Sequence, residues 1–339
     1  MKKDALYALI EGENIMKKFK RFAALALCAV TALSMCACSG SEKNDKKFTV
    51  GICQLVEHDA LDAATKGFKE ELTKKLEAEG YTVEFKEQSA QGDSATCTTI
   101  INGYVSQGVD LILANATAPL QSAAAGTTTI PILGTSVTDY ASALDIDNWA
   151  GTTGRNISGT SDLAPLTEQA AMIKELFPDA KNVGILYCSA EANSQYQADV
   201  IKEELKGLGM ECEFYTFVDT NDVATVTTKA AEQSDVIYVP TDNTVASNTG
   251  VIDNICRPAG VPIVAGESGI CSGCGVATLS IDYYDLGSTT GEMAYEILVK
   301  DADITKMEVK FAPKVTKKYN AEICTALKIE IPEGYEAIQ

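Results

Sequence analysis

From residue 48 onward, the chain alternates between short apolar runs of β-type and longer segments with helical spacing. The helical spacing is clearest at 60–80, where apolar residues recur every three or four positions and Gly80 ends the segment. This alternation predicts strands at 48–53, 81–87, 110–114 and 130–134, and helices at 60–80 and 96–108. It restarts at residue 182, with strands predicted at 182–188, 211–217, 235–239, 262–265 and 276–280, and helices at 193–209, 222–233 and 244–260.

The repeat constrains the fold more than any other feature. Strands that alternate with helices are typical of parallel sheets covered by helices on both faces. The repeat runs twice, and 339 residues suffice for two domains. We therefore predict an α/β protein with two doubly wound parallel-sheet lobes.

The N-terminal segment has the features of an export signal. A basic cluster at 17–21 precedes an apolar run at 22–35, which is short for a transmembrane helix, and small residues and cysteines follow. We predict that 1–37 comprises a signal peptide that begins naturally at Met16, together with an upstream extension.

The end of this segment predicts a lipid anchor. Cys38 resembles the acylated first residue of bacterial lipoproteins because the small Ala37 precedes it. Acylation of Cys36 and an ordinary cleaved signal are the alternatives. The polar stretch at 38–47 is then a lipidated tether, and the predicted location is the outer face of the bacterial cell membrane.

Charge and motif content argue against several functions. The net charge is −19, whereas nucleic-acid binding requires clustered Lys and Arg, so we expect no nucleic-acid partner. His58 is the one histidine, and the chain lacks the G-x-S-x-G, H-E-x-x-H, P-loop and G-x-G-x-x-G motifs. We therefore expect neither enzymatic activity nor a cofactor.

Polar residues follow the predicted strands at their carboxyl ends, where open parallel sheets bind ligands. Each loop taken alone has an ordinary explanation, because Ser, Thr, Asp and Asn favour turns and helix N-caps. Together the loops offer hydroxyls and helix N-termini for a carboxylate and acids for an ammonium group, which suits an amino acid. The polar loop residues include Gln54, Glu57, His58, Ser136, Thr138, Asp139, Glu191, Asn193, Ser194, Thr241, Asp242, Asn243 and Glu267.

Several of these loops also resemble one family. The matching segments are 56–62, 90–93, 137–139, 158–162, 189–194, 239–247 and 281–287. In this order they resemble the solute-binding lipoproteins related to tryptophan and tyrosine ABC transporters. The resemblance implies a type I periplasmic-binding-protein fold whose chain crosses a multi-strand hinge three times, an aromatic amino acid ligand (Trp, Tyr or Phe), and an ABC permease as partner of a monomer.

The resemblance also implies lobe boundaries and site residues. The N-terminal lobe is expected at 48–160 plus about 283–308, and the C-terminal lobe at 161–282 plus about 309–339. The implied ligand contacts are Gln54, Glu57, Thr138 and Asp139 from the first lobe, Glu191, Asn193, Ser194, Thr241, Asp242 and Asn243 from the second, and Ser161, Asp162 and Tyr283 near the crossovers; Glu267 joins them because it follows a predicted strand.

Two positions depart from the family pattern. Asp59 stands where relatives carry Pro, and the segment at 140–155 differs and contains the one tryptophan, Trp149. Trp149 is predicted either to stack on an aromatic ligand or to have a hinge or packing role.

Eight cysteines lie beyond the predicted signal and anchor, and only Cys271 and Cys274 form a close pair. We place this pair in a glycine-rich turn. Free thiols, a disulfide involving Cys256, Cys271 or Cys274, and a metal or redox site all remain open. The alternative functions are therefore a sensor lobe for another small solute, such as a branched-chain amino acid or sugar, and a cysteine-based redox or metal protein.

Overall fold

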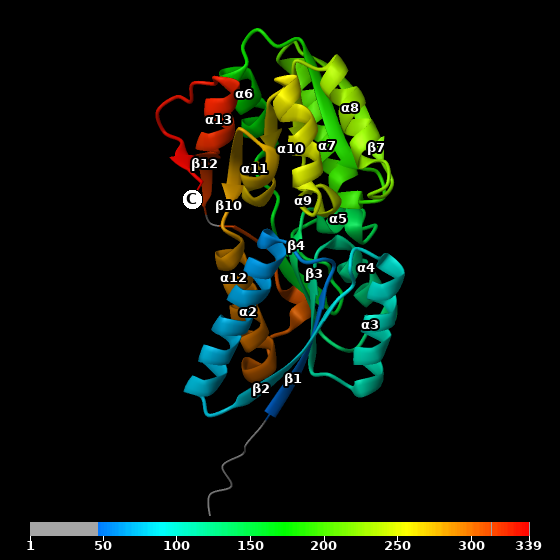
Figure 1. The fold of residues 1–339 in the computed structure, drawn as a ribbon. Coiled ribbons are helices and arrows are strands. Elements are labelled where there is room, and N and C mark those ends of the chain that lie inside the picture. The colour runs from blue at the N-terminus through cyan, green and yellow to red at the C-terminus, as the bar shows by residue number, and fades with distance from the viewer. Residues whose placement is uncertain (1–46, 313, 339) are drawn as a thin grey trace, which may run out of the picture. The chain divides into compact units, whose positions relative to one another are not determined.

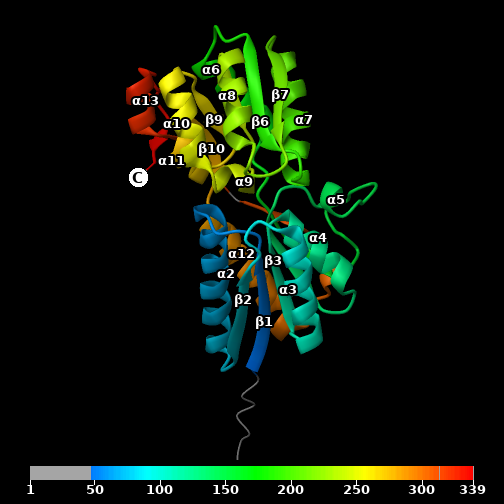
Figure 2. The same ribbon diagram turned by 45° about the vertical axis from the view of Figure 1, so that its right-hand side comes forward.

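The computed structural model describes residues 47–312 and 314–338. The predicted signal peptide at 1–37 and the predicted tether, Cys38 included, lie outside the described residues except for Lys47. Within the described part, no helix combines the length and apolar character that crossing a membrane requires. Two α/β lobes, each with one sheet, make up this part of the chain (Figure 1, Figure 2).

The first lobe is a parallel sheet covered by helices on both faces. Its elements are β1 (Lys47–Gln54), α2 (Asp59–Ala78), β2 (Thr82–Ser89), α3 (Ser94–Gln107), β3 (Leu111–Asn115), α4 (Thr117–Gly126), β4 (Ile132–Val137), α5 (Tyr140–Ala143), β5 (Ile157–Ser161), α12 (Tyr283–Lys300), the 3-10 helix η1 (Ile304–Lys306) and β11 (Lys310–Phe311). The strand order is β11-β5-β4-β3-β1-β2. One apolar core joins the sheet to α2 and α12, and another joins it to α3 and α4.

The second lobe repeats this plan. Its elements are α6 (Leu166–Leu176), β6 (Asn182–Cys188), α7 (Ala192–Gly207), β7 (Glu211–Phe217), α8 (Val223–Gln233), β8 (Val236–Val239), α9 (Asn243–Ala246), α10 (Thr249–Ala259), β9 (Ile263–Ala265), α11 (Ser268–Cys274), β10 (Ala277–Ile281), β12 (Val315–Tyr319), α13 (Ala321–Leu327) and β13 (Glu336–Ala337). The strand order is β13-β12-β10-β9-β8-β6-β7. Helices α6, α7 and α13 cover one face, and α8, α10 and α11 cover the other.

The predicted fold of two doubly wound lobes is confirmed, with local differences. β10 and β12 pair antiparallel, so the second sheet is mixed. The helix predicted at 244–260 is two helices, α9 and α10, separated at Ser247 and Asn248. The segment predicted as a glycine-rich turn is helix α11, because the Glu267 carboxylate accepts from the amides of Gly269 and Ile270 and caps its first turn.

The chain crosses between the lobes after β5, after β10 and after β11. Lys310 and Phe311 pair with β5 in the first sheet, and β12 begins at Val315 in the second. The third crossing therefore falls after Phe311, slightly later than the boundary expected at about 308. These crossings leave the carboxyl ends of the parallel strands in both lobes next to the hinge.

Helix α2 is held against α12 by small residues, and the two lie side by side in both views (Figure 1, Figure 2). A Cβ added at Gly287 would overlap the carbonyl oxygen of Ala64, and one added at Gly291 would lie 2.8 Å from that of Phe68. Only glycine allows this approach of two helix backbones. The packing holds the N-terminal half of α2, which follows β1 at the crossing end of the sheet.

Candidate functional site

A small pocket lies where strand ends of the two lobes meet. Its lining residues are His58, Ala60, Leu61, Ser136 and Thr138 from the first lobe, and Asp162, Asn193, Thr241, Asp242, Asn243, Ala246, Glu267 and Tyr283 from the second lobe and the crossings. The cavity between these atoms is small, about 10 Å³, which is room for about one water molecule. The lobes must therefore part to admit a larger ligand.

Asp242 is the most perturbed acid of the pocket. It follows β8 and caps α9, accepting from the amides of Val245 at 2.8 Å and Cys188 at 2.7 Å. The side chain is buried. Burial, reinforced by the negative charge of Glu191, raises the pKa of Asp242 to about 8. A cation beside this carboxyl would favour its ionised form.

Glu191 lies behind the pocket and holds the segment that lines it. Its carboxylate accepts from the Asn243 side-chain amide at 2.6 Å and from the Thr244 backbone amide and hydroxyl, both at 2.8 Å. The side-chain amide of Asn193 donates to Glu191, to the Ser194 hydroxyl and to the Thr241 carbonyl. Glu191 and Ser194 therefore support the pocket without being among its lining residues.

Asp162 and Glu267 add two more buried acids. Asp162 lies at the first crossing and accepts from the hydroxyls of Thr138 and Tyr283, each at 2.9 Å. Burial raises the pKa of Asp162, and burial likewise raises the pKa of Glu267. Ser161 supports this corner because its hydroxyl donates to the Thr138 carbonyl at 2.8 Å.

His58 bridges the two lobes at the pocket. Its Nε2 lies 3.2 Å from the Asn243 Oδ1. The Asn243 amide nitrogen donates to the Glu191 carboxylate, which has only acceptor atoms when ionised, so Oδ1 is the atom that faces His58. We assign the proton to Nε2 of His58 from this network, which makes the imidazole the donor.

Besides Glu191, Ser194 and Ser161, three more residues predicted as ligand contacts do not line the pocket. Gln54 is buried in a network of the first lobe, where it donates to Asp62 at 2.6 Å and accepts from Thr65 at 2.6 Å. Glu57 is exposed, and Asp139 caps α5 through the Ser142 amide. Local hydrogen bonding turns these side chains into their own lobe or toward solvent, and their contact with a ligand stays a prediction.

Conversely, five lining residues are absent from the predicted site. His58 and Ser136 follow predicted strands, so their positions in the sequence do indicate the pocket. Sequence alone does not separate them from polar residues that only form turns. Ala60, Leu61 and Ala246 are apolar and belong to the first turns of α2 and α9. No motif marks such residues, because their place in the pocket depends on where each helix begins.

Trp149 lies outside the pocket lining. Its ring stacks on Tyr140, with ring centroids 6.4 Å apart and an interplanar angle of 21°, and it packs against the core of the first lobe. This geometry agrees with the packing alternative rather than with stacking on a ligand.

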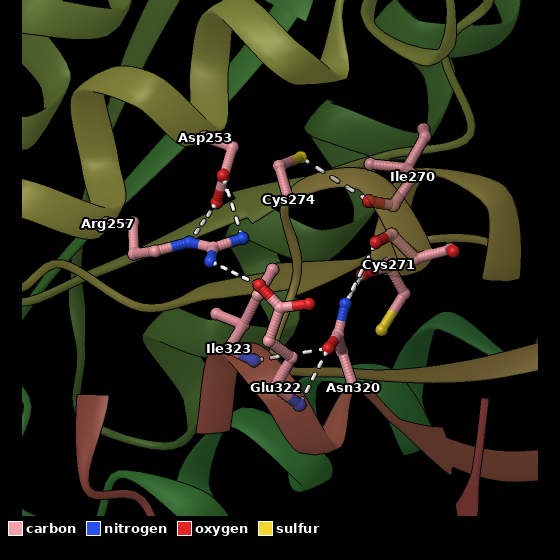
Figure 3. Close-up of polar contacts among 9 residues, drawn as sticks. Asp253, Arg257, Ile270, Cys271, Cys274, Asn320, Glu322 and Ile323 are labelled. Carbon is pink, nitrogen blue, oxygen red and sulfur yellow. Dashed lines mark hydrogen bonds and ion pairs between the residues drawn. The ribbon is translucent and has the colours of Figure 1, made fainter. Parts of the chain in front are cut away.

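The cysteines carry no disulfide within the described residues. All eight are free, and only Cys212 is partly exposed. In Figure 3 the thiols of Cys271 and Cys274 point away from each other, and the Cys274 thiol donates to the Ile270 carbonyl. Burial raises the pKa of both thiols, so neither is activated as a thiolate. In the described part of the chain, no group of three or more His, Cys, Asp or Glu side chains is arranged so that it could hold a metal ion.

The chain belongs to the class of two-lobed ligand-binding proteins, because it has two lobes, three crossings between them and an interlobe pocket rich in acids. Residues 49–337 match the family described as ABC transporter substrate binding protein, and the chain belongs to this family. A curated relative from Clostridioides difficile (strain R20291), named "Tyrosine-binding protein", is 33% identical over 311 residues, which is 86% of this chain and 89% of the relative. The fold is that of the type I periplasmic binding proteins.

Two solved structures also resemble the chain. The ABC domain in complex with L-Trp from Streptococcus pneumonia is 30% identical, with a TM-score of 0.79, and covers 85% of this chain and 100% of that one. A ligand-free, open substrate-binding protein from Clostridium difficile is 34% identical, with a TM-score of 0.65, over 86% and 99% of the two chains.

Proposed function

We propose that this chain binds an aromatic amino acid between its lobes and delivers it to an ABC permease. The observation that carries the proposal is the charge of the pocket. Asp162, Asp242 and Glu267 are each at most 3% exposed, and no Lys or Arg is among the described lining residues. Buried carboxyls without a cationic side chain match a ligand that brings its own ammonium group.

The relatives narrow the ligand class. One is named for tyrosine and another was solved with L-Trp. Apolar contacts for a side chain are available from Leu61, Ala246 and the ring of Tyr283. Because the pocket is small with the lobes in this arrangement, binding proceeds through an open form that closes by hinge motion and excludes water.

The proposed place of action is the outer side of the cell membrane. The chain acts outside the cytoplasm as a monomer anchored by lipid on Cys38, and it performs no chemistry on the ligand. Support comes from the basic and apolar N-terminal pattern and from membership of the ABC transporter substrate-binding family. ATP hydrolysis belongs to other subunits of the transporter.

Calorimetry with the purified protein tests the ligand. Heat of binding is expected with tryptophan, tyrosine or phenylalanine, and not with leucine, myo-inositol or glucose. Asp242→Asn should weaken binding at least tenfold because the ammonium loses a buried counter-charge. Glu232→Gln, which neutralises an exposed acid on α8, is the matched control and should bind normally. Binding of a sugar or leucine in place of the aromatic amino acids would refute the assignment.

A further inference from the structure

Strand β1 and helix α3 pack on one another through a small set of facing positions. Gly51 and Cys53 are two residues apart on β1, so both positions face the same side of the sheet. On α3, Cys97 and Tyr104 are seven residues apart, which places them on one face of the helix. The Tyr104 ring lies against Gly51, where an added Cβ would be 2.6 Å from a ring carbon. This register places Cys97 over Cys53.

The thiols of Cys53 and Cys97 are in direct contact. Both side chains are fully buried in the same apolar core, and a hydrogen bond joins the two thiols. By contrast, the thiols of Cys188, Cys274 and Cys324 donate to backbone carbonyls. Cys53 and Cys97 therefore form a thiol pair rather than two isolated cysteines.

Backbone contacts on either side hold this thiol pair in place. The Ala90 amide donates to the Gln54 carbonyl at 2.9 Å, which attaches the turn before α3 to the end of β1. Further along α3, the Tyr104 hydroxyl donates to the Ile52 carbonyl at 2.8 Å. The helix cannot shift along the strand without breaking one of these contacts. Two sulfur atoms held together by a fixed backbone are the arrangement that a disulfide requires.

The contact makes the two thiols unequal. The hydrogen bond from Cys53 lowers the pKa of the Cys97 thiol, and the same contact, together with burial, raises the pKa of Cys53. Cys97 lies in the first turn of α3, where the partial positive charge of the helix N-terminus also favours a thiolate. Burial instead raises the pKa of the other six described cysteines. Cys97 is therefore the nucleophile of the pair.

From this arrangement we propose that Cys53 and Cys97 are a redox site that closes to an intrachain disulfide by exchange with a disulfide of low molecular weight. The Cys97 thiolate attacks one sulfur of the oxidant, which forms a mixed disulfide and releases the first thiol. Cys53 then loses its proton and attacks the Cys97 sulfur, which releases the second thiol. The chain gives up two electrons and two protons, and one oxidant disulfide becomes two thiols.

The surroundings of the thiol pair determine when the exchange takes place. Because both sulfur atoms are buried, the oxidant reaches them while the chain folds or when α3 opens from the sheet. Outside the cytoplasm, which is the proposed place of action, disulfides form and persist. The bond then ties α3 covalently to β1, and it is independent of the ligand that the protein binds.

Thiol mapping tests this redox site. The purified, reduced protein is equilibrated in buffers with a rising ratio of oxidised to reduced glutathione. Free thiols are then blocked with iodoacetamide, and the peptides are identified by mass spectrometry. Cys53 and Cys97 should become linked to each other, with the loss of two hydrogen atoms, at a lower ratio than any other pair of the described cysteines. The same pairing should appear when the protein is refolded from urea in these buffers, so slow access of the oxidant cannot hide it.

Single substitutions separate the roles of the two thiols. Cys53→Ala should leave Cys97 as a mixed disulfide with glutathione, because no second thiol completes the exchange. Cys97→Ala should leave Cys53 as a free thiol. Cys324→Ala is the matched control, since it removes a buried thiol that donates to a backbone carbonyl, and it should form the link normally. Melting curves check that each variant is folded.

Three results would overturn the proposal. Blocking of both Cys53 and Cys97 by iodoacetamide at every ratio, from the folded and the refolded protein alike, would show that no disulfide forms. A link from either residue to a different cysteine would show that the contact does not determine the pairing. A glutathione adduct on Cys53 of Cys97→Ala, with none on Cys97 of Cys53→Ala, would reverse the order of attack.

Discussion

Binding of the ligand should release protons, because the carboxyl of Asp242 is largely protonated before an ammonium group arrives. Burial and the neighbouring charge of Glu191 raise the pKa of Asp242 to about 8. With that pKa of about 8, about 0.9 of these carboxyls carry a proton at pH 7. An ammonium group in contact favours the carboxylate and lowers its pKa, so each binding event releases close to one proton.

The sign of the pH dependence follows from this release. Protons leave on binding, so affinity rises with pH as long as Asp242 is protonated in the free protein. The rise approaches tenfold per pH unit below pH 7 and flattens above about pH 8. Burial also raises the pKa values of Asp162 and Glu267, so these two carboxyls shift in the same direction as Asp242.

Calorimetry in buffers of different ionisation enthalpy measures the number of protons directly. At pH 7, the observed heat of binding plotted against the ionisation enthalpy of the buffer has a slope equal to the number of protons released. For the unmodified protein this number should be close to one. Asp242→Asn removes the titrating group, so its count should fall by about 0.9. Glu232→Gln should leave the count unchanged. A count near zero in the unmodified protein, or an equal count in Asp242→Asn, would refute this account of the pocket.

Three further predictions concern packing, thiols and closure. Gly287→Ala should destabilise the fold by about 1–3 kcal/mol, because the added Cβ overlaps the backbone of α2. Gly103→Ala is the control and should not, because the nearest atom to its Cβ is 3.9 Å away. Thermal unfolding measures both changes in stability. Cys212 should react first with a thiol reagent, and a buried cysteine that reacts equally fast would contradict the burial seen here. Asn243→Ala removes the acceptor for His58 between the lobes, so stopped-flow should show a faster off-rate and an unchanged on-rate.

The two-lobed α/β fold was predictable from periodicity because the central strands of each sheet are parallel and buried. Continuous apolar runs such as β3 and β8, buried at every position, separate clearly from amphipathic helices such as α2. The reversal of β12 was not predictable, because its five residues are half-buried and carry no pattern specific to an antiparallel neighbour. The short helices α9 and α11 begin after Asp242 and Glu267, whose local caps are not visible in the pattern of apolar residues.

Prediction of the site was less complete, for a reason that lies in the backbone. Gln54, Ser136 and Asp139 all occupy strand-end positions in the first lobe, yet only Ser136 lines the pocket. Ser136 has a φ of 54°, a left-handed conformation that sequence position alone does not indicate for a serine. In contrast, Gln54 is held by Asp62 and Thr65 within its own lobe. Strand topology therefore predicts which loops lie at the pocket, whereas local hydrogen bonding determines which of their side chains line it.

The distribution of charge couples ligand binding to closure. Bringing Asp162, Asp242 and Glu267 together under the first lobe removes them from water, which is unfavourable unless they are protonated or paired. An ammonium group supplies the missing counter-charge at the moment water is excluded, when each electrostatic contact becomes stronger. A cationic ligand therefore favours closure with the carboxylate of Asp242 ionised, whereas closure without a ligand keeps the proton on Asp242.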